Sequence, residues 1–427
     1  MADIRPFRGL RYDAAEADPA LTIAPPYDVI SAEQQRALYE RSAQNIVRVE
    51  YGEALATDAA ADNRYTRAAA ELASWRASGV LVRDERPALY VYRQGFEWGG
   101  ERYVRTAAFA AVRLEPWDAG VIRPHERTLP KPKADRLELL RATRTQVSPV
   151  YALWRSRGAP FEAPAADAAL YDFEADGQRH TLGAVYGERA QAAFAEGLRS
   201  SDVYIADGHH RYETALAYRD EMRARAGAWT GEEAENFVLM ALTASDDAGL
   251  LVLPTHRIID PPLMPEDALA RIGRYLSAEE IAPDAAEASR RLAAAGGTAF
   301  VAVGLRPGAA YVLELRDRSG VEALIPADQP DAWRRLDVNV LQYGVLQEVF
   351  GIDKRAIAEG SVVTYTQDAP EAFAAVASGK AKLAFLLNAT PVEQVLAVAD
   401  AGGRMPQKST YFYPKLPTGL VLRALEA

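Results

Sequence analysis

The stretch YIADGHHRYETALAYR, from Tyr204 to Arg219, places two of the chain's five histidines side by side between Asp-Gly and Arg. A short apolar run precedes the Asp-Gly, and apolar residues at helical spacing follow it. The pattern predicts a strand that ends in a turn and continues as a helix. The first turn of a helix has backbone N–H groups without intrahelical partners and the positive end of the dipole, so it can bind an anion such as phosphate.

The side chains of this turn favour a phosphate site. Gly208 would let the backbone approach the ligand closely. His209, His210 and Arg211 add donors, and an arginine can bind two phosphate oxygens at once. Asp207 can cap the helix, hold a histidine tautomer or bind Mg²⁺, so we take Asp207 and His209 as candidate catalytic residues and Asp207 as a candidate Mg²⁺ ligand. Two other interpretations are a purely structural turn and a zinc site, although adjacent histidines point in different directions.

A second segment, IRPHERT, surrounds Glu126. It opens a basic window, residues 121–145, which has seven Lys or Arg and three acidic residues. A carboxylate among cationic groups stays ionised and can accept a proton, so Glu126 is a candidate general base. A loop glutamate paired with Arg123 or Arg127 is an equally good interpretation. We count Arg123 and His125 among the candidate phosphate-binding residues.

A third segment, MPQKSTYFYPKLPTG, occupies residues 405–419. It combines lysines, hydroxyl groups and aromatic rings within a proline-framed loop. Lys408, Ser409 and Thr410 could bind the phosphate or carboxylate of a substrate. Loops of this composition also cover the edge of a core, and both interpretations remain open.

The overall composition limits the class of protein. With 427 residues, 49% of them hydrophobic and 25% charged, the chain predicts a soluble protein of two or three domains. It has no cysteine, which excludes disulfides and thiolate chemistry. The net charge of −10 disfavours a nucleic-acid partner and an anionic membrane surface. The N-terminal residues lack the apolar core of a secretion signal, so we expect a cytoplasmic location.

The pattern of elements predicts an α/β protein. We expect a strand over residues 45–50, a hairpin around Trp98-Gly99-Gly100 and a helix over 135–142. Farther along, strands are expected over 298–304, 310–315 and 381–387, and helices over 338–350 and 391–399. The Asp-Pro-Pro at Asp260 predicts a domain boundary.

Together the three segments resemble the free L-serine kinases, relatives of the ParB and sulfiredoxin fold. The matching residues are Pro124-His125-Glu126, Asp207-Gly-His-His-Arg211 and Pro406-Gln-Lys-Ser-Thr410. The whole chain also looks like a bacterial family of proteins of unknown function, through the motifs RPFRGLRY, APPYD, GHHRYETA and KSTYFYPK.

The resemblance implies a fold and an activity. The fold would be α/β with mixed sheets: a ParB/sulfiredoxin-like nucleotide-binding core over residues 116–262 with an insertion near 156–200, an N-terminal α/β region over 1–115, and a C-terminal α/β domain over 263–427. The activity would be transfer of phosphate from ATP or ADP, with Mg²⁺, to the hydroxyl of free L-serine or a similar amino or hydroxy acid. Glu126 would be the base.

Two functions other than the kinase are also compatible with these residues. One is a ParB-like regulatory protein that binds a nucleotide without catalysis, and the other is a metal-dependent hydrolase. The expected partners are the nucleotide and the small acceptor, with no nucleic acid and no membrane, and a homodimer is left open.

Overall fold

The computed structural model describes the chain except residues 129, 159, 359–361, 407 and 427. The chain forms two compact units, which we describe separately. Unit 1 comprises Met1–Pro124, Thr128–Leu250 and Pro414–Ala427, and unit 2 comprises His125–Arg127 and Leu251–Tyr413. Both units combine helices and sheets, so the protein is mixed α/β, as predicted.

A nine-stranded mixed sheet forms the centre of unit 1. Its strands are β1 (Ile4–Arg5), β4 (Leu89–Trp98), β5 (Glu101–Arg113), β6 (Ile122–Arg123), β8 (Val150–Ser156), β9 (Ala168–Ala175), β10 (Gln178–Val185), β11 (Ser201–Asp207) and β12 (Phe237–Ala244). The order is β6-β11-β8-β12-β5-β4-β10-β9, with β1 paired to β5. β11 is parallel to β6 and β12 is parallel to β8, and the other pairs are antiparallel.

This sheet joins strands from both sides of residue 115. The observed grouping into two units therefore differs from the three predicted regions, because β4 and β5 from the N-terminal region pair into the same sheet as β8 and β12. The predicted hairpin is confirmed: Trp98 pairs with Glu101, and Gly99 and Gly100 supply the positive φ angles of a tight turn.

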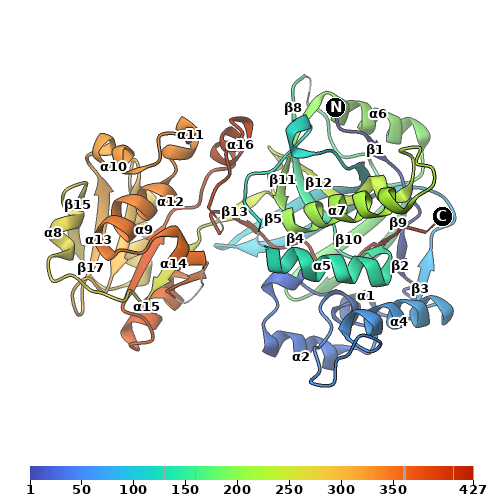
Figure 1. Cartoon of the computed structure of the whole chain (residues 1–427), viewed down its shortest axis with the longest axis horizontal. Coiled ribbons are helices and arrows are strands. Elements are labelled where there is room, and N and C mark those ends of the chain that lie inside the picture. The colour runs from blue at the N-terminus through green and yellow to red at the C-terminus, as the bar shows by residue number, and fades with distance from the viewer. Residues whose placement is uncertain (129, 159, 359–361, 407, 427) are drawn as a thin grey trace. The chain divides into compact units, whose positions relative to one another are not determined.

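The helices of unit 1 pack on its sheet or against one another. They are α1 (Pro19–Thr22), η1 (Tyr27–Val29), α2 (Ala32–Arg41), α3 (Val47–Glu50), α4 (Arg64–Ala77), η2 (Trp117–Ala119), α5 (Pro130–Thr143), α6 (Glu188–Arg199), α7 (His209–Arg225) and η3 (Ala234–Asn236). Two short ladders, β2 (Leu10–Tyr12) with β3 (Leu81–Arg83) and β7 (Thr145–Gln146) with β21 (Arg423–Ala424), complete the unit. Apolar side chains of α6 and α7 pack on the strands, and Figure 1 shows α5 beside α7.

The strand predicted over residues 45–50 is wrong. The segment is instead a helical turn, α3, because Asn45 fixes the local backbone from both sides. Its side-chain oxygen accepts the Val47 N–H at 3.0 Å, while its amide nitrogen donates to the carbonyls of Leu21 and Ile23. These tertiary contacts override the β propensity of the valines and isoleucine.

A six-stranded antiparallel sheet forms the centre of unit 2. Its strands, in order across the sheet, are β15 (Leu276–Ile281), β17 (Ala310–Leu315), β16 (Ala299–Val303), β19 (Leu383–Leu387), β14 (His256–Ile259) and β18 (Val363–Thr366). A separate ladder pairs β13 (Leu251–Leu253) with β20 (Tyr411–Tyr413). The helices are α8 (Ala268–Ile272), α9 (Ala285–Ala294), α10 (Arg318–Leu324), α11 (Asp331–Arg334), α12 (Asp337–Val340), η4 (Leu341–Gln347), α13 (Glu348–Phe350), α14 (Lys354–Ala358), α15 (Ala369–Ala377) and α16 (Val392–Asp400).

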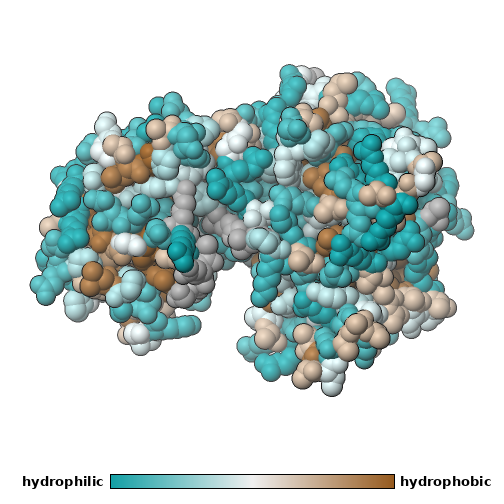
Figure 2. All heavy atoms as spheres, viewed as in Figure 1, coloured by the Kyte–Doolittle hydropathy of each residue, from teal (hydrophilic) through white to brown (hydrophobic). Residues whose placement is uncertain are grey.

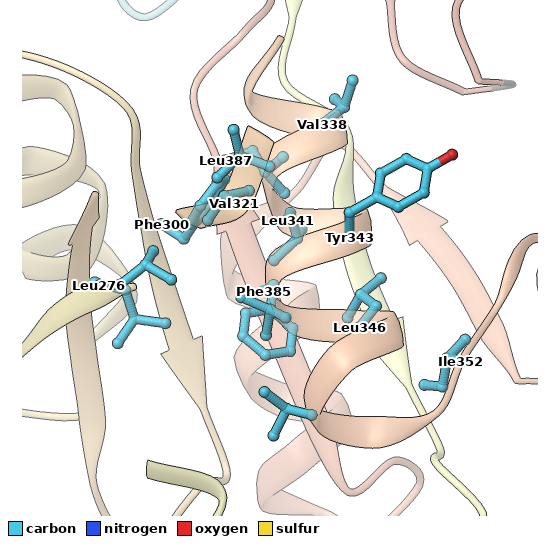
Figure 3. Close-up of a cluster of buried hydrophobic side chains, with 14 of the residues drawn as sticks. Leu276, Phe300, Val321, Val338, Leu341, Tyr343, Leu346, Ile352, Phe385 and Leu387 are labelled. Atoms are coloured by element: carbon cyan, nitrogen blue, oxygen red, sulfur yellow. The ribbon is translucent and has the colours of Figure 1, made fainter. Parts of the chain in front are cut away.

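The main core of unit 2 lies between its sheet and the helical stretch α12–η4–α13. Phe385 and Leu387 of β19 meet Leu341 and Leu346 of η4 there (Figure 3). A second apolar cluster packs α9 and α15 on the other face of the sheet. On the face drawn in Figure 2, hydrophilic residues cover most of the surface of each unit. Within the described part of the chain, no helix has both the length and the apolar character needed to cross a membrane.

Candidate functional site

The predicted strand, turn and helix around the paired histidines are confirmed. β11 ends at Asp207, α7 begins at His209, and Gly208 lies between them in the left-handed conformation, with φ 89°. No side chain of the described residues caps α7 at this end, and the Gly208 carbonyl accepts the Tyr212 N–H at 3.0 Å. A 17-residue helix therefore begins directly after a strand, with the N-terminal geometry that suits an anion.

Gly208 is required here for two reasons. Its positive φ is unfavourable for any other residue, and a Cβ built on it would lie 2.9 Å from Nε of Arg211. We expect Gly208→Ala to lower the free energy of unfolding by about 1–3 kcal/mol, measured by urea denaturation. Gly227→Ala is the matched control, since its Cβ would meet no atom within 4 Å. Equal stabilities of the two variants would contradict this account of Gly208.

Asp207 is held between two cations. Its Oδ1 accepts from Nζ of Lys415 at 2.7 Å and its Oδ2 accepts from Nη2 of Arg211 at 2.7 Å. Burial by itself raises the pKa of Asp207, but attraction from Lys415 and Arg211 outweighs it and lowers the pKa well below its usual range. Asp207 is therefore an ionised residue that fixes the positions of two cations at the start of α7.

The same contacts bear on two predicted roles. Asp207 does not fit the predicted Mg²⁺ ligand, because both of its oxygens already accept from cations. The described residues contain no group of three His, Asp or Glu that could hold a metal ion, so the zinc and metal-hydrolase interpretations gain no support from them. Arg211 uses Nη1 on the Pro149 carbonyl and Nη2 on Asp207, so its role in binding phosphate stays a prediction.

The two histidines differ in their surroundings. His209 is buried and His210 is half-buried. Burial lowers the pKa of His210, although the nearby Asp28 and Glu213 favour its charged form. His210 is therefore neutral at pH 7 and offers one ring nitrogen as donor and the other as acceptor.

A buried polar cluster lies beneath the first turns of α7. Ser148 Oγ donates to Glu50 Oε1 at 2.6 Å and lies 2.9 Å from the Thr418 hydroxyl, and Arg136 Nη1 donates to the Glu50 carbonyl at 2.7 Å. Glu50, Arg136, Ser148 and Arg211 border a cavity of about 50 Å³. Nε of Arg211 is buried without a hydrogen-bond partner in the described part of the chain, and the cavity has room for a water molecule to supply one. The start of α7 is thus supported by segments from four distant parts of the sequence.

Glu213, one turn into α7, anchors the segment that follows Glu126. Its Oε2 accepts from the Thr128 hydroxyl at 2.6 Å and from Lys133 Nζ at 2.9 Å, and its Oε1 accepts from the Trp117 indole at 3.3 Å. Burial raises the pKa of Glu213, but the bonds from Thr128 and Lys133 lower it overall. Within unit 1, Thr128 and Lys133 are therefore both fixed to α7 through Glu213.

Arg123 contacts residues earlier on β11 than the turn. Its Nη2 lies 2.8 Å from Oδ1 of Asp202, and its Nη1 donates to the Tyr204 hydroxyl at 3.3 Å. These partners precede Asp207 by five and three residues. The predicted phosphate contact of Arg123 therefore stays a prediction.

The other predicted site residues belong to unit 2. Glu126 forms a parallel β-bridge with Met405, whose N–H donates to the His125 carbonyl at 2.6 Å. Nε2 of His125 lies 3.2 Å from the Thr410 hydroxyl, so the structure joins the predicted Pro-His-Glu and Lys-Ser-Thr segments.

The Lys-Ser-Thr loop itself divides into buried and exposed positions. Ser409 is buried, and its hydroxyl donates to the Pro406 carbonyl at 2.6 Å. This hydrogen bond stabilises the loop. Lys408 is exposed and has φ 57°. Gln407, part of the predicted motif, lies outside the described residues.

Sequence reasoning did not assign Lys415 or Glu213 to the site. Lys415 stands in the YPK letters of the C-terminal motif, but its pairing with Asp207 links positions 208 residues apart. Glu213 lies four residues after His209, on the same face of the helix. That spacing could have indicated that Glu213 lies next to the predicted site.

Comparisons with known proteins give a family. The family described as "Protein of unknown function (DUF1015)" matches residues 4–339. No curated protein matches the sequence.

Three solved structures resemble the chain at low sequence identity. A variant of a free serine kinase in complex with ADP has 15% sequence identity and a TM-score of 0.36, covering 74% of this chain and 92% of that chain. A conserved hypothetical protein from Pyrococcus furiosus has 14% identity and a TM-score of 0.35, covering 74% and 95%. SbnI with a C-terminal truncation, from Staphylococcus aureus, has 11% identity and a TM-score of 0.35, covering 74% and 87%. Similarity at this level transfers no activity.

Proposed function

The chain belongs to the DUF1015 family of proteins of unknown function, and we propose that it is a small-molecule kinase that transfers phosphate from ATP or ADP to the hydroxyl of a small amino or hydroxy acid. The observation that carries the proposal is the start of α7. There Gly208 brings the backbone into a left-handed turn, and a 17-residue helix that no side chain of the described residues caps begins close to Arg211 and Lys415. Backbone N–H groups and the helix dipole at such a position favour the phosphates of a nucleotide.

The proposal assigns the proton transfer to Glu126. Its carboxylate would take the proton of the acceptor hydroxyl as the oxygen attacks the terminal phosphorus. The bond between that phosphorus and the bridging oxygen would break, and the shortened nucleotide would leave with the electron pair. Catalysis of this kind depends mainly on positioning and charge stabilisation. The bridge of Glu126 with Met405 and the contact of His125 with Thr410 support the assignment, because they fix the chain at Glu126 within unit 2.

The roles of the remaining residues follow from the same proposal. His209, His210 and Arg211 would surround the nucleotide phosphates, with Asp207 and Lys415 holding the turn in shape. Lys408 and Thr410 would contact the acceptor or the transferred group. A serine acceptor and a ParB/sulfiredoxin-like core belong to the proposal as well, on the three motifs alone.

The test incubates the full chain with ATP or ADP, Mg²⁺ as the counterion of the nucleotide, and a panel of amino and hydroxy acids. Phosphorus NMR then follows new phosphomonoesters. We expect one with at least one acceptor. Tight nucleotide binding without a phosphomonoester from any acceptor would instead favour the regulatory nucleotide-binding function.

A further inference from the structure

Thr255 and Arg257, in unit 2, are buried polar residues with unused hydrogen-bonding capacity. Thr255 is 3% exposed, and its hydroxyl has no hydrogen-bond partner among the residues that the structure describes. Arg257 is 6% exposed, and Nη1 donates to the Thr255 carbonyl. No carboxylate of the described residues forms an ion pair with Arg257. A buried charge without a countercharge and a buried hydroxyl without a partner both oppose folding, so their presence at one place requires an explanation.

The surroundings of Arg257 are largely apolar. On β14 it stands opposite Tyr365 of β18 and Phe385 of β19, and its guanidinium carbon lies 5.6 Å from the centre of the Tyr365 ring. Phe385 belongs to the core drawn in Figure 3. Burial lowers the pKa of Arg257 to about 10, so the group remains a cation at neutral pH. Stacking on Tyr365 accounts for the position of the guanidinium but leaves the Thr255 hydroxyl unexplained.

The predicted catalytic segment of unit 2 lies in the same region. The pKa of Tyr365 responds to both Arg257 and Glu126. Burial raises this pKa, the positive charge of Arg257 lowers it, and the carboxylate of Glu126 raises it. Two residues before Thr255, Leu253 pairs with Tyr411, the residue after Thr410. The Thr410 hydroxyl in turn lies 3.2 Å from Nε2 of His125, the residue before Glu126. Thr255 and Arg257 therefore lie in the same region of unit 2 as the predicted base.

We propose that Thr255 and Arg257 bind the carboxylate of the phosphoryl acceptor. A carboxylate would accept parallel N–H bonds from the guanidinium and a bond from the Thr255 hydroxyl, supplying both missing partners with one group. This inference rests on the proposed function and narrows its acceptor to hydroxy acids with a free carboxylate. An alcohol that lacks the carboxylate would leave Arg257 without its countercharge.

Calorimetric titration of the full chain tests the subsite directly. The ligands are L-serine and glycerate, their carboxylate-free counterparts ethanolamine and ethylene glycol, and inorganic phosphate. We expect the wild-type protein to bind at least one of the two acids more tightly than its counterpart. Arg257→Lys keeps the positive charge but loses the parallel N–H donors of the guanidinium. It should therefore weaken binding of the acid about a hundredfold. Thr255→Val should weaken it about tenfold, and neither variant should change binding of the counterparts.

The stability of Thr255→Val separates a binding role from a structural one. Since the change removes an unpartnered buried hydroxyl and preserves its shape, the variant should melt no lower than the wild-type protein while binding the acid less well. Unchanged acid binding in both variants would overturn the proposal. So would a wild-type protein that binds neither acid, or one that binds phosphate at this position in their place.

The outcomes also separate this proposal from the kinase function. Acid binding that depends on Arg257 and Thr255, without any phosphomonoester, would support the carboxylate subsite and reject phosphoryl transfer. Phosphomonoester formation with equal efficiency on L-serine and ethanolamine would support the kinase and reject the subsite.

Discussion

Glu126→Gln should lower the turnover of phosphoryl transfer by at least about a hundredfold while leaving nucleotide binding largely intact. A positioned general base contributes about 10²–10⁴-fold to a rate, and the glutamine amide keeps the shape of the side chain but cannot accept the proton. Turnover is measured by phosphorus NMR with the best acceptor, and nucleotide binding by calorimetry.

Glu138→Gln is the matched control for this prediction. Glu138 lies on α5 in the same basic window, but it is exposed and pairs with Arg141. The same change of glutamate to glutamine at that position should leave turnover unchanged. Equal turnover in Glu126→Gln and the wild-type protein would remove Glu126 from the mechanism, even if the kinase activity itself is present.

Asp207→Ala should lower the free energy of unfolding by about 3 kcal/mol. The change leaves the cations of Arg211 and Lys415 largely buried without the carboxylate that both of them bind, and removing one partner of such a group is strongly destabilising. Urea denaturation at neutral pH measures the loss. Asp220→Ala on the same helix is the control, because Asp220 pairs with Arg219 at the surface and should contribute much less.

The pH dependence of this difference has a defined sign. Because the pKa of Asp207 is lowered in the folded state, its ion pairs stabilise the fold fully above the ordinary aspartate pKa of about 4. This contribution is lost as the pH falls below that value. The stability gap between wild type and Asp207→Ala should therefore narrow below about pH 4. A gap that widens in acid, or a loss in Asp207→Ala no larger than in Asp220→Ala, would contradict the role of the two cations.

The turn between β11 and α7 could be predicted because its information is local. A short apolar run, Asp-Gly and apolar residues at helical spacing follow one another within sixteen residues, so the turn at Gly208 and the start of α7 could be predicted from the sequence alone. The hairpin at Gly99 was equally local. Residues 45–50 show where this reasoning fails: the intrinsic preference for a strand was outweighed by hydrogen bonds from Asn45 to Leu21 and Ile23, which only the folded chain brings together.

The pairing of side chains across the fold could not be predicted in this way. Nothing local in Tyr-Pro-Lys indicates that Lys415 will share the carboxylate of Asp207 with Arg211. In the same way, the residues Pro254 to Arg257 do not reveal that the Thr255 hydroxyl lacks a hydrogen-bond partner among the described residues, or that Arg257 is buried without a countercharge from them. Burial depends on which strands become their neighbours.

The sequence by itself therefore determined most of the local elements, including the strand, turn and helix start around Gly208, and the family to which the chain belongs. Hydrophobic periodicity and turn preferences depend on residues a few positions apart, so short sequence motifs are enough to reveal them. The tertiary structure alone decided which charges compensate each other, which predicted residues are committed to holding the fold, and which buried groups still lack a partner. Those properties depend on distances between residues far apart in the chain. The interaction energies of these groups become large only when folding removes the groups from water.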